Sequence, residues 1–419
     1  MYVNRRVIFY PHEAVLEAAR RFPTPFFLYS EARLRENCRN FRKAFSTYFP
    51  DFKPLFAVKA NANPDLLRIV QDEGFGFDCS STAELFLAHL FDVEGMYTGN
   101  YVRREEFEYA IQNTRLILNL DDISALETVR DIGMPEALSL RINPGAHQST
   151  SKLLVKQWSM SGVDAKYGIP FERASDAYSL AQSMGVKHFG IHMMTGSNVL
   201  DEDYFYFTTK KLLTIVAEIK QNTGVVIEFL NIGGGFGVPY RPCEHSINLN
   251  AVARNVHKAF KEVCARYELQ PPRLYAEPGR YISADTGWLV GRVTSTKEGY
   301  KKFVGIDASS NDMPRPSIYD AYHHISIMNN ARTRERVSVV GSICENNDQF
   351  ARDRLLPSCA SGDIVVIHNC GGHAYAMGHN YNNKLRHAEY LIRDSGKIDE
   401  IRKAETIEDL FRGTNLTGY

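Results

Sequence analysis

The chain has 419 residues, and its 49 lysines and arginines balance its 49 aspartates and glutamates, so the formal charge at pH 7 is zero. This balance gives no electrostatic reason to expect a nucleic acid or an anionic membrane as a partner. Hydrophobic residues make up 44% and charged residues 23%, which is typical of a folded chain and excludes global disorder.

Neither a membrane span nor a disulfide framework is predicted. No apolar run approaches the ~20 residues that a bilayer span requires. The first residues lead into Phe9-Tyr-Pro-His rather than into the apolar stretch of a signal peptide. The seven cysteines are an odd number without a CxxC pair, so we expect reduced thiols and no metal site. These features predict a cytoplasmic protein.

The first two thirds of the chain alternate short apolar runs with helical patterns. Buried strands that alternate with helices are typical of parallel βαβ units, and eight of them in roughly 250 residues match a (β/α)8 TIM-type barrel. We expect this barrel over residues 31–279, with an open, doubly wound sheet as the alternative. The expected strands are 55–60, 75–80, 95–100, 115–120, 137–143, 188–193, 229–234 and 273–277. The expected helices are 63–73, 83–90, 122–130, 173–183, 203–221 and 249–267.

After Pro278 the pattern changes to strands that are separated by turn residues. Residues 280–419 therefore predict a C-terminal β domain, a β-sandwich or β-barrel, which residues 1–30 join through a strand at 26–29. The expected strands of this domain are 288–296, 303–308, 336–342 and 363–369. The long stretch 144–168 has no periodicity, and loops of that length are usually functional, so it is a candidate lid.

Polar side chains or glycines stand at the ends of all eight expected barrel strands. Catalytic residues of such barrels lie at the carboxyl ends of the strands. Any one of these residues could be a simple cap, but a lysine, several carboxylates and a glycine run at one mouth indicate a functional site. The residues are Lys59, Asp78, Asn100, Asn119, Arg141, His192, 233–235 and Glu277.

Three of these features suggest particular chemistry. Burial lowers the pKa of a lysine, and a neutral amine at Lys59 could form a Schiff base with an aldehyde; the alternative is a salt bridge to a neighbouring carboxylate. The glycines of 233–237 let backbone N–H groups approach an anion, or they form a plain tight turn, and their spacing fits neither a dinucleotide motif nor a P-loop. Glu277 could keep a pyridine nitrogen protonated, or it could pair with Arg280 across a turn.

These segments together resemble a family. Ala57-Val-Lys-Ala-Asn-Ala-Asn, Asp78-Cys-Ser-Ser-Thr-Ala-Glu-Leu, Gly233-Gly-Gly-Phe-Gly and Glu277-Pro-Gly-Arg resemble the pyridoxal-phosphate decarboxylases of the alanine-racemase-like fold. More narrowly, Gly341-Ser-Ile-Cys-Glu-Asn-Asn-Asp and the run from Asn311 to Ile325 are similar to the diaminopimelate decarboxylases. The motifs occur in family order from about residue 25 to 415. The resemblance implies a barrel with a C-terminal β domain and pyridoxal 5'-phosphate as cofactor.

The resemblance also implies roles for individual residues. Lys59 would form the Schiff base, Asp78 would belong to the network around it, and Glu277 would face the pyridine nitrogen. Family members place a histidine on the cofactor ring where this chain has Met194, which can stack but cannot titrate. Many relatives have a tyrosine where this chain has His373, which can still donate to phosphate. The remaining implied cofactor contacts are Ser197, Gly234, Gly235, Gly279, Arg280 and, more weakly, Tyr375.

A homodimer with shared active sites is implied as well. Cys344 would donate a proton in the partner's site, and Glu345 would hold the far amino group of the substrate. Arg280, Arg315 and Tyr319 would hold its far carboxylate, because arginine offers planar, bidentate donors.

The expected reaction is decarboxylation of meso-2,6-diaminopimelate to L-lysine and carbon dioxide. A related decarboxylase that acts on another amino acid, or on a carrier-tethered one, is the main alternative, since Met194 and His373 depart from the family pattern. A non-catalytic relative is disfavoured because Lys59 and Cys344 are both present. Amino-acid racemisation is disfavoured by the long C-terminal domain with its Cys-Glu motif.

Overall fold

The computed structural model describes residues 3–145 and 160–415. The chain divides into two units, and each has its own sheet. One unit comprises Glu36–Val238 and Ser246–Ile282; the other comprises Met1–Arg35, Pro239–His245 and Ser283–Tyr419. We refer to them as the barrel unit and the β unit. Most of the candidate lid, residues 146–159, lies outside the described residues.

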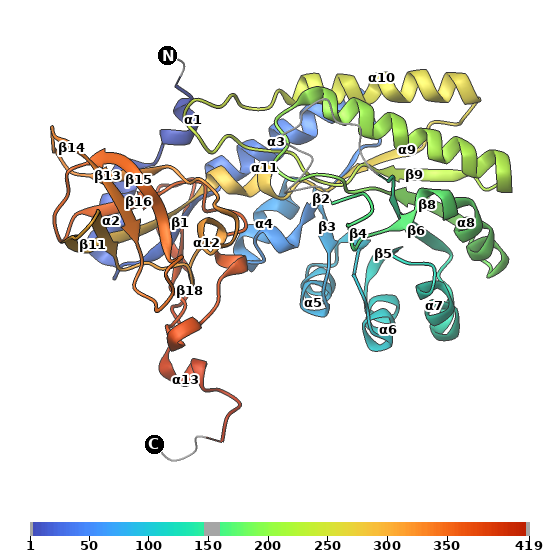
Figure 1. Cartoon of the computed structure of the whole chain (residues 1–419). Coiled ribbons are helices and arrows are strands. Elements are labelled where there is room, and N and C mark those ends of the chain that lie inside the picture. Colours follow the sequence, from blue (N-terminus) through green and yellow to red (C-terminus); the bar gives the residue numbers. More distant parts are fainter. Residues whose placement is uncertain (1–2, 146–159, 416–419) are drawn as a thin grey trace. The chain divides into compact units, whose positions relative to one another are not determined.

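The barrel unit contains a closed barrel of eight parallel strands (Figure 1). The strands run in the order β5-β4-β3-β2-β10-β9-β8-β6, and pairing between β5 and β6 closes the ring. The predicted barrel is therefore confirmed, and the open-sheet alternative is wrong. The strands are β2 (Lys53–Ala57), β3 (Gly76–Cys79), β4 (Glu94–Tyr97), β5 (Arg115–Leu120), β6 (Ala137–Asn143), β8 (His188–His192), β9 (Ile227–Asn231) and β10 (Arg273–Ala276). A two-residue strand, β7 (Ile169–Pro170), pairs in parallel with the end of β6.

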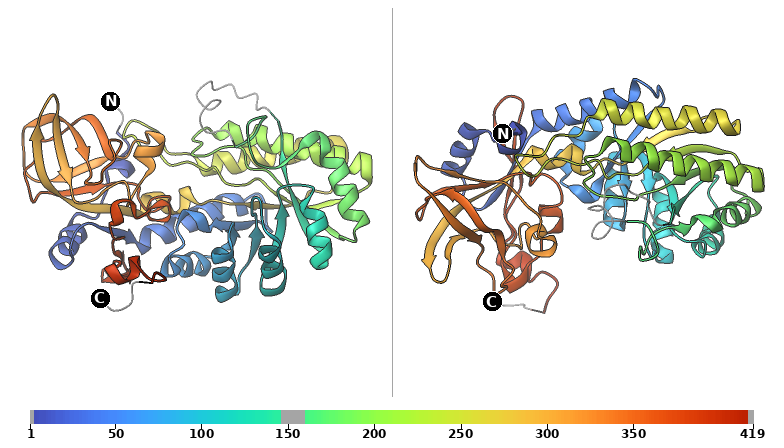
Figure 2. Two further views of the ribbon diagram at one scale, coloured as in Figure 1. Left: turned by 60° about the horizontal axis from the view of Figure 1, so that its bottom comes forward. Right: turned by 45° about the horizontal axis from the view of Figure 1, so that its top comes forward.

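Helices connect the strands, and local signals set their ends. Helix α4 begins after the N-cap Asn63, with Pro64 in its first turn, and α9 ends at Gly224 in the left-handed conformation. Figure 2 shows the long helices α9 and α10 side by side. The helices are α3 (Glu31–Ser46), α4 (Pro64–Asp72), α5 (Thr82–Phe91), α6 (Arg104–Asn113), α7 (Ala125–Gly133), α8 (Ala174–Ser183), α9 (Glu202–Thr223), α10 (Leu249–Tyr267) and α11 (Arg280–Ser283).

The β unit is built on a mixed sheet, in which the N-terminal strand β1 lies between β11 and β17. Its strands are β1 (Phe26–Ser30), β11 (Gly287–Glu298), β12 (Lys302–Ile306), β13 (Ile325–Met328), β14 (Arg334–Val340), β15 (Gln349–Pro357), β16 (Ile364–Ile367), β17 (Glu389–Ile392) and β18 (Ile398–Arg402). Its helices are α1 (Arg5–Ile8), α2 (His12–Arg21), α12 (Arg315–Tyr319) and α13 (Ile407–Leu410).

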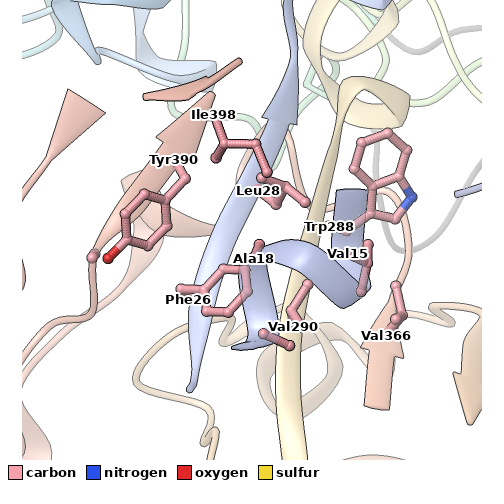
Figure 3. Packing of buried hydrophobic residues seen from close by; sticks show 11 residues of the cluster. Val15, Ala18, Phe26, Leu28, Trp288, Val290, Val366, Tyr390 and Ile398 are labelled. Carbon is pink, nitrogen blue, oxygen red and sulfur yellow. The ribbon is translucent and has the colours of Figure 1, made fainter. Parts of the chain in front are cut away.

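One hydrophobic cluster joins helix α2 to this sheet (Figure 3). Alternate residues of β1, Phe26 and Leu28, belong to the cluster, as the two-residue period of a strand requires. Trp288 of β11 and Tyr390 of β17 pack with them. The cluster therefore holds the N-terminal strand within a sheet that is otherwise made from the last third of the chain.

No helix within 3–145 and 160–415 is both long and apolar enough to cross a membrane.

Candidate active site

Lys59 and Asp78 meet at the carboxyl ends of neighbouring strands. Strands β2 and β3 pair Ala57 with Asp78, and Lys59 follows β2 in the short 3-10 turn Val58–Ala60. The Nζ atom of Lys59 lies 2.7 Å from Oδ2 of Asp78. The salt bridge considered for Lys59 is thus present. Because 47% of the lysine side chain is exposed, the amine is also accessible.

The charges around Lys59 set its pKa. Burial alone would lower that pKa, but the carboxylates of Asp78 and Glu277 more than offset this effect and raise it. Burial, assisted by Glu277, raises the pKa of Asp78 to about 6 even though Lys59 opposes the shift. Burial also raises the pKa of Glu84, which accepts the N–H of Ser80, to about 7. The carboxylates of Asp78, Glu84 and Glu277 therefore all interact with the single positive amine of Lys59.

Glu277 follows β10 and is held by two donors. Its Oε1 atom accepts the side-chain amide of Asn231 at 2.6 Å, and its Oε2 atom lies 3.2 Å from Nε2 of His192. Burial raises the pKa of Glu277, but His192, Lys59 and the Asn231 hydrogen bond lower it to about 2. Glu277 is therefore a buried anion. On the other side of the ring, His192 Nδ1 lies 2.9 Å from the amide nitrogen of Asn119.

His192, a strand-end residue two positions before Met194, is 1% exposed and contacts Glu277 and Asn119. Asn231, which sequence reasoning missed, completes this arrangement at the end of β9; its position two residues before the glycine run was the available signal.

The glycine run forms a turn against the loop after β8. Gly233 and Gly235 adopt φ values of 69° and 88°, which favour glycine. A Cβ atom on Gly235 would lie 2.7 Å from the carbonyl oxygen of Gly196, so a side chain there would clash. The N–H of Gly234 points at Sδ of Met194, 3.2 Å away.

The turn after β10 brings two further candidates to this region. Arg280 Nη2 lies 3.4 Å from Oγ of Ser197. A Cβ atom on Gly279 would come within 3.0 Å of the Cβ of Ala60, beside the turn that carries Lys59. The barrel unit therefore brings together the nine barrel residues to which the resemblance gave a role: Lys59, Asp78, Met194, Ser197, Gly234, Gly235, Glu277, Gly279 and Arg280.

Arg141 is a strand-end residue to which the sequence assigned no role. It is 4% exposed, lies 3.5 Å from Asp121 and stacks on Tyr167 at 4.4 Å. Its Nη2 atom has no hydrogen-bond partner among the described residues, and neither has Oδ1 of Asp78. Buried polar atoms normally find partners, so both atoms indicate space for a polar ligand.

The remaining candidates belong to the β unit. Arg315 is buried on α12, whereas Tyr319 at the end of this helix is 42% exposed. Cys344 and Glu345 lie on an exposed turn between β14 and β15. The N–H of Cys344 donates to Oδ1 of Asn382 at 2.6 Å, which fixes the backbone of the turn.

The last two candidates lie near the strand β16. His373 has a left-handed backbone with φ of 56°. The ring of Tyr375 is covered by the guanidinium of Arg386 at 4.0 Å, and burial raises the pKa of this tyrosine. This face of Tyr375 is thus already occupied by a cation.

Fold and site together define a pyridoxal-dependent decarboxylase. Residues 31–284 match the family described as pyridoxal-dependent decarboxylase, pyridoxal binding domain. The chain belongs to this family, and it is therefore an enzyme of the carboxy-lyase class that uses pyridoxal 5'-phosphate.

Individual relatives cover almost the whole chain. Diaminopimelate decarboxylase of Methanothermobacter thermautotrophicus is 37% identical over 408 residues, which are 96% of this chain and 94% of the relative. Protein TabA of Pseudomonas amygdali pv. tabaci is also 37% identical, over 94% and 91%. The crystal structure of diaminopimelate decarboxylase from M. jannaschii with L-lysine matches with a TM-score of 0.87 at 32% identity, covering 95% of this chain and 93% of that one.

The described residues of the barrel mouth fit the cofactor. The accessible amine of Lys59 suits the aldehyde of the cofactor, and the buried anionic carboxylate of Glu277 suits its pyridine nitrogen. The glycine turn beside Ser197 and Arg280 suits its phosphate. The atoms without partners in Asp78 and Arg141 leave polar capacity for such a ligand. The part of the chain described by the structure contains no cluster of three or more histidine, cysteine or acidic residues that could hold a metal ion.

Neutralising Asp78 tests whether this carboxylate controls the amine of Lys59. In the cofactor-free protein, Asp78→Asn should lower the pKa of Lys59, since the largest charge that raises it is removed. We expect trinitrobenzenesulfonate to label Lys59 about 3- to 10-fold faster in the variant at mildly alkaline pH. Quantitative peptide mass spectrometry measures the rates, with the exposed Lys187 as internal reference. Equal Lys59 rates in both proteins would contradict the assignment.

Proposed function

We propose that the enzyme decarboxylates meso-2,6-diaminopimelate to L-lysine and carbon dioxide, a reaction of lysine biosynthesis. The observation that carries this proposal is the likeness to a diaminopimelate decarboxylase whose crystal structure holds L-lysine, which is the proposed product. The likeness covers 95% of this chain and therefore extends over both units.

At the cofactor, the proposed roles follow from charge and reach. When bound, pyridoxal phosphate supplies an electron sink for the bond to carbon dioxide. Lys59 presents the amine that tethers the cofactor, and Asp78 orients this amine. Glu277, which His192 and Asn231 keep ionised, holds a proton on the ring nitrogen. Ser197, Gly234, Gly235, Gly279, Arg280 and His373 would donate to the phosphate, Met194 would pack on the ring, and Tyr375 would be a weaker contact of the cofactor.

At the substrate, the β unit supplies most of the proposed contacts. Arg315 and Tyr319, together with Arg280, bind the distal carboxylate, and Glu345 binds the distal amino group. Cys344 donates a proton to the carbon that has lost carbon dioxide. We infer a homodimer with shared active sites, in which Cys344 and Glu345 serve the partner's barrel; their exposure on one turn supports this arrangement.

We place the enzyme in the cytoplasm. No disulfide bond is present within the described part of the chain, and thiols fit a reducing compartment.

A second candidate function is decarboxylation of another amino acid by the same fold. Protein TabA and the diaminopimelate decarboxylase of Methanothermobacter thermautotrophicus are both 37% identical to this chain, and the name of TabA states no activity. Identity alone therefore does not select the substrate. A panel of meso-diaminopimelate, L-lysine, L-ornithine and L-arginine separates the two proposals.

The first test combines this substrate panel with the variant Lys59→Ala, which removes the amine that would tether the cofactor. The native enzyme should release carbon dioxide from meso-diaminopimelate and from none of the other three at a comparable rate, because only this substrate carries a distal carboxylate. Lys59→Ala should abolish turnover, and borohydride should attach the cofactor to Lys59 only in the native protein. Release from another amino acid but not from diaminopimelate would overturn the substrate assignment.

Mixing two inactive variants tests the shared sites. Lys59→Ala and Cys344→Ala each remove one half of every site, but a mixed dimer retains one intact site. Random exchange should therefore restore about a quarter of native activity, measured as carbon dioxide release. Lys59→Ala mixed with Glu277→Ala is the matched control: both changes affect the same half, so activity should stay absent. A monomer in solution, or no recovery of activity in the first mixture, would contradict the proposal of shared sites.

Shortening Met194 tests its contact with the cofactor ring. A sulfur–aromatic contact contributes about 0.3–1.5 kcal/mol, so Met194→Ala should weaken cofactor binding about 2- to 10-fold. Titration of the cofactor-free protein, followed by fluorescence, measures the affinity. Met194→Leu keeps the apolar volume without sulfur and should fall between the two. Unchanged affinity in Met194→Ala would show that this side chain does not touch the ring.

A further inference from the structure

The guanidinium of Arg315 is held from two sides within the β unit. Its Nη1 atom lies 2.7 Å from Nε2 of His323, and its Cζ atom lies 4.6 Å from the ring centre of Tyr240. The rings of Tyr240 and His323 meet edge to face, with their centres 4.9 Å apart. Only 7% of Arg315 is exposed, so packing and hydrogen bonding together restrict its orientation.

The neighbours of His323 dictate which of its nitrogens carries the proton. Nδ1 lies 2.8 Å from the carbonyl oxygen of His368, and a carbonyl can only accept, so Nδ1 donates. An arginine can only donate, so Nε2 must offer its lone pair to Arg315. His323 is fully buried, which leaves no water to replace either contact. The imidazole therefore acts as an acceptor aimed at one guanidinium nitrogen.

The backbone of His323 is set by the sheet. Strands β13 and β16 pair Ile325 with Ile367, and the N–H of His368 donates to the carbonyl of His324 at 2.9 Å. The carbonyl of His323 itself accepts a hydrogen bond from Arg354. A site built on paired strands is more rigid than one on a loop, so the acceptor has a fixed position.

We propose that His323 is a positioning residue that sets substrate specificity through Arg315. By fixing Nη1, it turns the other N–H groups of the guanidinium in one direction, where they can meet both oxygens of a distal carboxylate. A guanidinium that could rotate would still attract the anion but would lose the bidentate geometry. The inference rests on the proposed function, because it requires a substrate with a distal carboxylate.

Two substitutions of different length separate positioning from simple structural support. The amide of His323→Asn reaches the place of Nδ1 and can donate to the His368 carbonyl, but it ends short of Arg315. The longer His323→Gln reaches the place of Nε2 and offers an oxygen acceptor to Arg315. Diaminopimelate probes the distal carboxylate, and 1,5-diaminopentane, which carries both amino groups but no carboxylate, serves as a competitive inhibitor.

In the cofactor-loaded enzyme, His323→Asn should raise KM for diaminopimelate about 10-fold or more, because a misplaced Arg315 guanidinium binds the distal carboxylate poorly. It should change the inhibition constant of 1,5-diaminopentane by less than about 2-fold, since no distal carboxylate is involved. His323→Gln should return KM to within about 3-fold of the native value, since it restores the acceptor. Thermal melting confirms that each variant is folded.

Two results would overturn the inference. Equal losses for diaminopimelate and 1,5-diaminopentane would show that His323 only supports the fold, and a His323→Gln enzyme no better than His323→Asn would show that the acceptor is irrelevant. A native enzyme that does not turn over diaminopimelate refutes the proposed function instead, and the inference falls with it.

Discussion

The barrel mouth depends on keeping two buried carboxylates in different states around one lysine. Burial alone would raise the pKa of both Asp78 and Glu277. Only Glu277 receives hydrogen bonds from an imidazole and a side-chain amide in addition to the charge of Lys59, and its pKa falls to about 2, whereas that of Asp78 rises to about 6. Groups whose environments separate their pKa values take different chemical roles. Here Glu277 is the permanent anion, and Asp78 is the partner that orients the amine.

Much of the barrel was predictable because its signal is local. Each buried strand is a short apolar run, and the strand ends alone nominated Lys59, Asp78, His192 and Glu277 for one mouth. Helix α6 was missed because charged residues surround its buried Phe107 and Ala110 and hide their spacing. Strands β13, β15, β17 and β18 were missed because they are short or half-exposed, and β13 and β17 pair with strands that lie far away in the chain. The register of such strands comes from tertiary contacts that no local pattern contains.

The same distinction applies to the site. Lys59, the glycine run and the Glu277 turn stand in recognisable motifs, so sequence could nominate them. The orientation of Asn231, His192 and Tyr240 depends on partners 40 or more residues away, so their roles appear only in three dimensions. His192 shows this most clearly: the sequence placed it at a strand end without naming a partner, and the structure shows that it contacts the buried carboxylate of Glu277.

In each unit a buried histidine orients a charged side chain through its Nε2 atom, as a donor in the barrel unit and as an acceptor in the β unit. An ionised carboxylate accepts, so His192 must present Nε2–H to Glu277, and the imidazole serves an anion as a donor. An arginine donates, so His323 must present a bare Nε2 to Arg315, and the imidazole serves a cation as an acceptor. In each case the Nδ1 atom contacts a second group, the amide of Asn119 or the carbonyl of His368, at 2.9 and 2.8 Å. Replacing either histidine by an apolar residue would thus leave a buried charge without its orienting partner, which explains why polar residues occupy positions with 1% and 0% exposure.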